Sequence, residues 1–276
     1  MVTRRTVTVG PGVDLAVFVR EARPDKRAFV LVHGLASNAR LWDGVADHLA
    51  GFGHASVAVD QRGHGESSKP DGGYDFGTVA EDLAAVIEQA LGRPAVIAGQ
   101  SWGGNVVVEF ARRHPDLVAG IVCVDGGFIQ LADTFPVWED ARAALAPPDF
   151  AGFTMKQMQT MSKTRFADWP QSGIAGQLAN FEVVDGYVRA RLSRDNHMRI
   201  LRHLWEHRAD EAAREIDVPA LVLAVGRSEP GREERVDSFV SALPDGRLTW
   251  MDAHHDVHAQ HPELVADLMA TFAGGI

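Results

Sequence analysis

Hydrophobic residues occur along the chain in two alternating patterns, short continuous apolar runs and longer amphipathic stretches. The apolar runs predict strands buried on both faces, and the amphipathic stretches predict helices that cover them. The runs expected to form parallel strands are residues 29–33, 55–60, 95–99, 121–125, 220–225 and 248–251, after an antiparallel opening hairpin at 6–9 and 15–19. Helices are expected at residues 38–50, 79–90, 102–113, 232–242 and 263–272. This alternation predicts an α/β fold with a mostly parallel, eight-stranded sheet flanked by helices.

Residues 128–213 interrupt the alternation, because they contain no apolar strand run and are rich in methionine and aromatic side chains. This composition predicts a helical cap inserted after the sixth strand, on a core made of residues 1–127 and 214–276. A small cap has little core of its own, so part of its apolar surface is expected to cover a ligand, and methionine adapts to varied ligands. The residues expected to bind substrate from the cap are Trp138, Met158 and Trp205.

A Gly-x-Ser-x-Gly sequence at residues 99–103 lies between an apolar run and an amphipathic helical pattern. A strand, a sharp turn and a helix are the setting in which this motif presents a nucleophilic serine. The turn is expected to strain the backbone of Ser101, and a Cβ atom at Gly99 or Gly103 would clash as strand and helix close on each other. The free N–H groups of the helix would face a developing oxyanion. Ser101 is therefore the expected nucleophile.

A serine hydroxyl needs a base to take its proton, and imidazole titrates near neutral pH. A segment rich in histidine, with His254, His255, His258 and His261, follows the last strand run. Such a cluster can also indicate a metal site. No second cluster of histidine and carboxylate has ligand spacing, and the single cysteine, Cys123, lies in an apolar run. We therefore expect no metal and no cofactor.

Two carboxylates are candidates for the acid that orients the histidine. Asp125 ends a fully apolar strand run, at the sheet edge where ligands of parallel sheets bind. Glu229 follows the seventh strand and precedes a highly charged segment, residues 230–235, that is expected to be exposed. Because an exposed carboxylate orients a histidine poorly, Asp125 is favoured and Glu229 is the alternative.

Four motifs resemble those of one enzyme family. They are Leu31-Val-His33-Gly34-Leu35, Asp60-Gln-Arg62-Gly63-His64-Gly65, Gly99-Gln-Ser101-Trp-Gly103-Gly104, and His255 followed by His258 and Pro262. On these residues the chain resembles cap-bearing α/β-hydrolase fold proteins, a group that includes esterases, C–C hydrolases and haloalkane dehalogenases. The motifs span residues 28–110 and 217–273, and they are more specific for the fold than for the substrate.

The resemblance implies roles for individual residues. The family's C-terminal motif, G-H-x-x-H-x-x-x-P, has the base as its first histidine, and counting back from Pro262 places this role on His255. His254 replaces the usual glycine and is the alternative base. The family's acid after the seventh strand falls on Glu229, and the position after the sixth strand, which dehalogenases use, falls on Asp125.

An oxyanion hole needs two fixed N–H donors. One is expected from the backbone of Trp102, directly after the nucleophile, and the resemblance places the other at Leu35. His33 and Gly34 are grouped with the substrate-binding residues because they shape this loop. The loop that contains Arg62 is expected to be scaffold.

Charge and composition restrict the partners. The chain has 27 Lys and Arg against 37 Asp and Glu, a net charge of −10, which disfavours nucleic acid and anionic membranes. The single cysteine excludes an intrachain disulfide and fits a reducing compartment. No apolar run approaches the roughly 20 residues of a membrane span, and the N-terminus has no apolar signal segment. A cytoplasmic protein is expected, either a monomer or a homodimer.

These observations predict a cofactor-free serine hydrolase that cleaves a carboxylic ester, lactone or thioester of a small hydrophobic acid. The same triad also serves C–C bond hydrolysis, perhydrolysis or haloperoxidation, and lyase chemistry, which are alternatives. A ligand-binding protein on a hydrolase scaffold is a further alternative. A carboxylate on the substrate would be bound by Arg62 or by an arginine of the cap. Serine at position 101 excludes dehalogenation through an aspartyl nucleophile.

Overall fold

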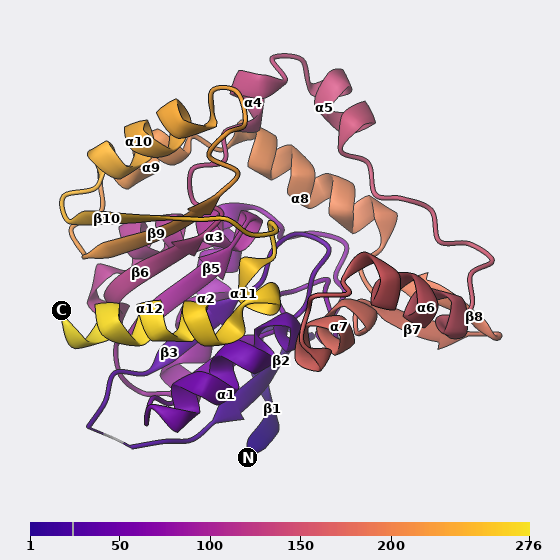
Figure 1. Cartoon of the computed structure of the whole chain (residues 1–276), viewed down its shortest axis with the longest axis horizontal. Coiled ribbons are helices and arrows are strands. Elements are labelled where there is room, and N and C mark those ends of the chain that lie inside the picture. Colours follow the sequence, from indigo (N-terminus) through magenta and orange to yellow (C-terminus); the bar gives the residue numbers. More distant parts are fainter. Residues whose placement is uncertain (24) are drawn as a thin grey trace.

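Eight strands form one sheet in the computed structural model, which describes residues 1–23 and 25–276 (Figure 1). The sheet order is β1-β2-β4-β3-β5-β6-β9-β10. The strands are β1 (Val2–Gly10), β2 (Val13–Arg20), β3 (Phe29–Val32), β4 (Ser56–Val59), β5 (Ala95–Gln100), β6 (Val118–Val124), β9 (Ala220–Val225) and β10 (Gly246–Met251). β1 and β2 form an antiparallel hairpin that joins β4 antiparallel, and the strands from β4 to β10 are parallel. The predicted sheet is confirmed.

Both faces of the sheet are buried, so each strand contributes alternate side chains to two cores. In β3, Val30 and Val32 join the core under α2 (Phe76–Ala90), α3 (Trp102–Arg113) and α10 (Arg232–Ala242). Phe29 and Leu31 join the core under α1 (Asp43–Gly51) and α12 (Pro262–Gly274), which pack against each other (Figure 1). Burial on both sides explains why these strands read as continuous apolar runs.

The helix expected at residues 38–50 is divided. A short 3-10 helix, η1 (Ala39–Trp42), precedes α1. The Asn38 side chain accepts the N–H of Arg40 at 2.9 Å, and its Nδ2 donates to the carbonyl of Gly176 at 2.9 Å. A side chain that caps the first turn and reaches the inserted segment therefore sets the start of η1.

The chain between β6 and β9 forms α4 (Leu131–Thr134), α5 (Trp138–Ala144), α6 (Met155–Arg165), α7 (Gln171–Leu178), β7 (Phe181–Val184), β8 (Tyr187–Ala190), α8 (Arg194–Glu206) and α9 (Ala209–Ala213). These elements form two groups: α8 packs with α4 and α5, while α7 packs with α6, η1 and α11 (Val257–Gln260). α9 contacts α3 and α10. The division into a core of residues 1–127 and 214–276 and a cap of residues 128–213 stays a prediction.

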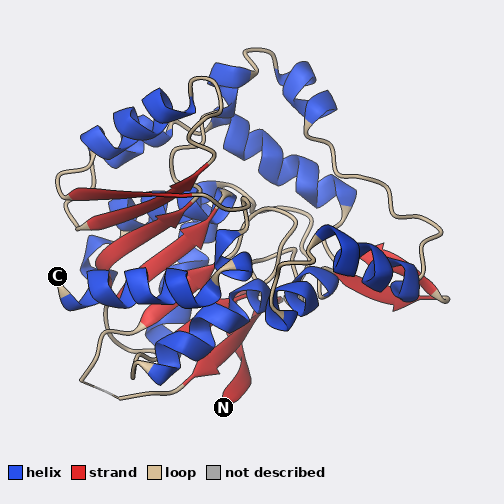
Figure 2. Cartoon of the chain, viewed as in Figure 1, coloured by secondary structure: helices blue, strands red, loops and turns tan. Residues whose placement is uncertain are grey.

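The insertion, expected to be helical, also contains two strands: β7 and β8 form a separate antiparallel hairpin, visible apart from the main sheet in Figure 2. Their turn is Asp185-Gly186, and both residues have positive φ, 52° and 86°. Aspartate followed by glycine between β-forming residues favours such a two-residue turn. The strands are four residues long and mostly exposed, so they lack the apolar run that marks the core strands.

Candidate active site

Ser101 lies in the sharp turn between β5 and α3. Its φ of 54° and ψ of −124° are a conformation that residues other than glycine rarely adopt. A Cβ atom on Gly99 would lie 2.1 Å from the carbonyl oxygen of Gly103, and one on Gly103 would lie 2.5 Å from that of His33. The structure therefore has the expected backbone strain at Ser101, and it leaves no room for a side chain at Gly99 or Gly103.

The turn after β6 packs against the serine turn. A Cβ atom on Gly126 would lie 2.1 Å from the carbonyl oxygen of Ser101, and one on Gly104 would lie 2.4 Å from the amide nitrogen of Gly127. The two turns therefore meet backbone to backbone. This contact brings the carboxyl end of β6, with Asp125, beside the nucleophile.

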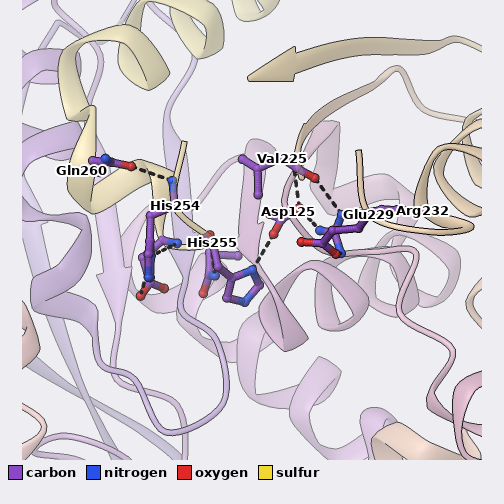
Figure 3. A network of polar contacts seen from close by, with 9 residues as sticks. Asp125, Val225, Glu229, Arg232, His254, His255 and Gln260 are labelled. Atoms are coloured by element: carbon purple, nitrogen blue, oxygen red, sulfur yellow. Dashed lines mark hydrogen bonds and ion pairs between the residues drawn. The ribbon is translucent and has the colours of Figure 1, made fainter. Parts of the chain in front are cut away.

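Asp125 and His255 form a direct pair, with the Nδ1 of His255 2.5 Å from the Oδ2 of Asp125 (Figure 3). Asp125 is 1% exposed and has a φ of 44°, and its Oδ1 accepts the N–H of Val225 at 3.1 Å. The side chain of His255 is 48% exposed, and the Gln100 amide donates to its carbonyl oxygen at 3.2 Å. The structure thus brings an anchored carboxylate and a half-exposed imidazole together.

The neighbours of His255 act on its pKa in opposite directions. Desolvation lowers the pKa of His255, but the hydrogen bond and charge of Asp125 outweigh it, so the pKa is raised above the ordinary 6.5. Asp256 adds to the increase and Arg232 opposes it. Because Nδ1 donates to Asp125, the Nε2 of the neutral ring is the acceptor.

His254 and Glu229, the two alternatives, lie outside this pair. The Nδ1 of the His254 ring accepts the backbone N–H of Asp256 at 3.1 Å. The backbone N–H of His254 donates to the side-chain oxygen of Gln260 at 2.7 Å. The Glu229 side chain is 60% exposed, and its Oε2 is 3.5 Å from Arg232. In the described part of the chain, Asp125 is the carboxylate that contacts the ring of His255.

Arg232 is a site residue that sequence reasoning missed. Its Nη2 forms an ion pair with the Oδ1 of Asp125, and its Nε donates to the carbonyl of Val225 at 2.7 Å (Figure 3). The residue begins α10, directly after the loop that contains Glu229. The sequence signal was an arginine within the charged segment 230–235, which was expected to be exposed.

A cavity of about 380 Å³ opens beside Ser101 and His255. Leu35 and Trp102, the residues expected to form the oxyanion hole, line it with them. Most of the remaining wall is apolar, and it consists of Phe128, Ile129, Leu131, Leu145, Leu201 and Leu204. The polar wall residues are Gln130, Thr134, His197, Arg232 and Arg235. The site can therefore take a small, mostly apolar ligand against the serine.

The aromatic and methionine residues expected to bind substrate do not line this cavity. Trp138 and Trp205 pack edge to face with ring centres 6.0 Å apart, and the indole of Trp205 donates to the carbonyl of Phe135 at 2.7 Å. Met158 lines a separate hollow with Phe166. The face of α8 that lines the cavity carries His197, Leu201 and Leu204. Trp205 is one residue further along the helix and therefore points in another direction.

His33 and Gly34 do not line the cavity either. They support the loop that leads to Leu35, which does line it. The buried His33 ring lies with Nδ1 2.8 Å from the carbonyl of Gly34, and its Nε2 accepts the N–H of Gln61 at 3.1 Å. A Cβ atom on Gly34 would lie 2.4 Å from the side-chain oxygen of Gln100. Both residues hold the loop that carries Leu35 close to Ser101.

The loop after β4 is scaffold in its contacts. Asp60 accepts the N–H groups of Ala39 and Glu66, each at 2.7 Å. Arg62 is buried and forms two hydrogen bonds of 2.6 Å with Asp82. Since its guanidinium is committed to this pair, Arg62 is not the substrate cation considered from the sequence.

A sequence model of the alpha/beta hydrolase fold matches residues 27–172, more than half of the chain. The chain belongs to the α/β-hydrolase fold family. A non-heme chloroperoxidase of Streptomyces lividans is 28% identical to this α/β hydrolase over 96% of the chain and 98% of that protein. A 2-(acetamidomethylene)succinate hydrolase of Mesorhizobium japonicum is 37% identical, over 34% of this chain and 33% of that protein.

Solved structures agree with the family. The structure of E-2-(acetamidomethylene)succinate hydrolase matches with a TM-score of 0.83 at 25% identity, covering 99% of this α/β hydrolase and 100% of that chain. A thioesterase domain from the curacin biosynthetic pathway has a TM-score of 0.77 at 17% identity and shows the fold alone. The relatives named here are enzymes with different reactions, so the family supports an enzyme without defining the bond that it cleaves.

Two further properties bear on what this α/β hydrolase can bind. Across residues 1–23 and 25–276, the His, Cys, Asp and Glu side chains form no group of three or more that is placed to hold a metal ion. Within the same residues, every helix is too short or too polar to cross a bilayer.

Proposed function

We propose that this protein is a serine hydrolase that cleaves a carboxylic ester, lactone or thioester of a small hydrophobic acid through an acyl-enzyme. One observation carries the proposal: the strained Ser101 lines the same mostly apolar cavity as His255, and the buried Asp125 holds the ring of His255. Asp125 holds the Nδ1–H of His255, which leaves Nε2 to take the proton of the Ser101 hydroxyl during attack. The described atoms include no hydrogen bond between Ser101 and His255, and catalytic contacts of this kind often tighten only with substrate bound.

The remaining steps use groups that line the same cavity. The N–H of Trp102, at the start of α3, and the N–H of Leu35 would stabilise the tetrahedral oxyanion. The imidazolium of His255 would then protonate the leaving alcohol or thiol. Water, activated by His255, would finally release the acid and restore the Ser101 hydroxyl.

A second candidate, transfer of the acyl group to hydrogen peroxide, is favoured by the resemblance to a non-heme chloroperoxidase along nearly the whole chain. In this reaction hydrogen peroxide replaces water at the acyl-enzyme. The products are a peracid and the free serine, and the peracid can oxidise a halide in solution. The triad residues would have the same roles in both reactions.

A substrate panel tests both reactions. Wild type and Ser101→Ala would be assayed with p-nitrophenyl esters, lactones and thioesters, with and without hydrogen peroxide. Ester turnover that is lost in Ser101→Ala supports the hydrolase, and peracid formation that exceeds acid release supports the second candidate. Turnover that persists in Ser101→Ala at the wild-type rate would reject both.

We also propose that residues 128–213 act as a cap that sets substrate preference, on a core of residues 1–127 and 214–276. The cap side of the cavity, with Leu145, Leu201 and Leu204, supports this role. The buried and unpaired Cys123 suits a cytoplasmic enzyme, which is the location that we propose.

A further inference from the structure

The carboxylate of Asp125 is held from two sides (Figure 3). His255 contacts its Oδ2, while the Val225 N–H and the guanidinium of Arg232 contact its Oδ1. The Arg232 side chain is only 17% exposed, its Nε donates to the Val225 carbonyl, and its guanidinium lies 5.4 Å above the ring of Phe128. Contacts with β9 and with the turn and loop after β6 therefore fix this cation against the acid.

We propose that Arg232 is a positioning residue that holds Asp125 and takes up part of its negative charge, so that His255 can release its proton after each step. The proposal rests on the serine hydrolase mechanism above. A buried aspartate paired with histidine alone would stabilise the imidazolium strongly, and a permanently charged base cannot accept the serine proton. A fixed arginine on the opposite oxygen weakens that stabilisation without moving the carboxylate.

The charged and titratable groups around His255 give this balance its sign. Asp125 and Asp256 both favour the imidazolium, whereas Arg232 disfavours it. His258, on α11, is fully buried, and burial lowers its pKa to about 3, so it stays neutral at working pH. Arg235 and His197 line the same cavity as His255, but Arg232 is the cation that contacts Asp125 and that opposes the two carboxylates at this base.

Glu229 explains how the loop after β9 takes part. This residue is the alternative acid of the sequence analysis, but it is exposed and its Oε2 is 3.5 Å from the Nη1 of Arg232. The loop thus contributes to the acid indirectly, through an arginine three residues later. The acid itself is Asp125, directly after β6.

An NMR titration of the His255 ring in the full chain tests the role of Arg232. The ring signal is assigned by comparison with His255→Asn. Arg232→Met removes both charge and hydrogen bonds, Arg232→Gln keeps a donor without the charge, and Arg232→Lys keeps the charge. We expect the Met and Gln variants to raise the pKa of His255 by about one unit, and the Lys variant to change it by less than about half a unit. The matched control is Arg227→Met, which removes an exposed arginine paired with Glu233 in the same loop and should leave this pKa unchanged.

The pH profile of kcat/KM on an ester gives a second measurement. In Arg232→Gln the loss should be about tenfold larger at pH 6 than at pH 9, because more of the base is protonated at the lower pH. A purely structural role would reduce the rate equally at both values. An unchanged or lowered pKa in the Gln variant, or an equal shift in Arg227→Met, overturns the proposal. If Arg232→Met does not fold, the Gln variant decides the outcome. The NMR titration needs no turnover, so a pKa shift without ester cleavage would reject the proposed reaction and keep the role of Arg232.

Discussion

The two sides of the cavity are built from different kinds of contact. On the core side, Ser101 and Asp125 occupy turns with positive φ, 54° and 44°, that pack backbone to backbone through glycines. On the other side, α8 presents ordinary side chains such as Leu201 and Leu204. Its end is held by side-chain contacts, including stacking of His207 on Phe76 with ring centres 4.1 Å apart. The comparison teaches that reactive geometry is fixed by the backbone here, whereas the shape of the pocket depends on exchangeable side chains.

Removing the nucleophile should have the largest effect. Ser101→Ala is expected to reduce ester turnover by about 10⁶-fold while the protein unfolds as cooperatively as wild type, because triad residues act as a unit. Fluorophosphonate labelling and mass spectrometry would check the site. Labelling on a residue other than Ser101 would contradict the assignment.

Substitution of the two candidate acids, Asp125 and Glu229, should affect kcat to degrees that differ by orders of magnitude. Asp125→Asn is expected to lower kcat by about 10⁴-fold, because the amide no longer holds the reactive form of His255. Glu229→Gln should lower kcat by less than about tenfold, since its exposed carboxylate reaches only Arg232. Steady-state kinetics of both variants measure this ratio, and the opposite ranking would move the acid to the loop after β9.

Substitutions on the inserted side should change preference more than rate. Leu201→Ala enlarges the cavity and is expected to shift the ratio of kcat/KM for long over short acyl chains by about tenfold. Met158→Ala is the control, because Met158 lines a different hollow and should leave the ratio unchanged. Equal shifts in the two variants would mean that α8 does not set the pocket.

The pH dependence of the rate should reflect the acid–base pair. Because the pKa of His255 is raised above 6.5, kcat/KM of wild type is expected to fall as pH decreases through a value above 6.5. In Asp125→Asn this limb should move to lower pH, since the main contact that raises the pKa is lost. If the limb lies at the same pH in both enzymes, it reports the titration of a group other than His255.

The smallest effect concerns stability on the core side. Burial, followed by the charges of His255 and His33, lowers the pKa of His258 to about 3, and neither ring nitrogen has a hydrogen-bond partner among the described residues. Below the ordinary pKa of 6.5 the unfolded chain binds a proton that folded His258 refuses, so stability falls as pH drops from 6.5 toward 3.

His258→Phe keeps a ring against Trp42 and should remove about 2 kcal/mol of the loss in unfolding free energy between pH 8 and pH 5. Urea unfolding at the two pH values measures this difference. A difference between the two pH values that is as large in His258→Phe as in wild type would contradict this account of the pH dependence.

The sequence predicted what depends on local pattern. The apolar runs located the sheet, and the setting of Ser101 between strand and helix located its strained turn, because both follow from residues adjacent in the chain. For the acid that pairs with His255, the sequence left two candidates, Asp125 and Glu229. Asp125 was favoured because it ends an apolar run. The hairpin at Asp185-Gly186 was missed because its strands are short and exposed, although the turn itself carries a recognisable signal.

The rest depended on packing between distant elements. Nothing in the order of residues 227–235 says that Arg232 turns inward to Asp125 while Arg227 pairs at the surface. The same holds for α8, where a rotation of one residue decides that Leu204 faces the cavity and Trp205 does not. The aromatic and methionine content of residues 128–213 therefore did not identify the residues that form the cavity wall.

The backbone contact between Gly126 and Ser101 has a consequence for the exchange of segments between relatives. The nucleophile turn and the acid turn fit only as a matched unit, since any side chain at Gly126 would collide with the serine backbone. A chimaeric protein that takes β5 from one parent and β6 from another joins two surfaces with no room for adjustment. Recombination junctions should therefore fall before Ala95 or after Gly127, so that both turns come from one parent.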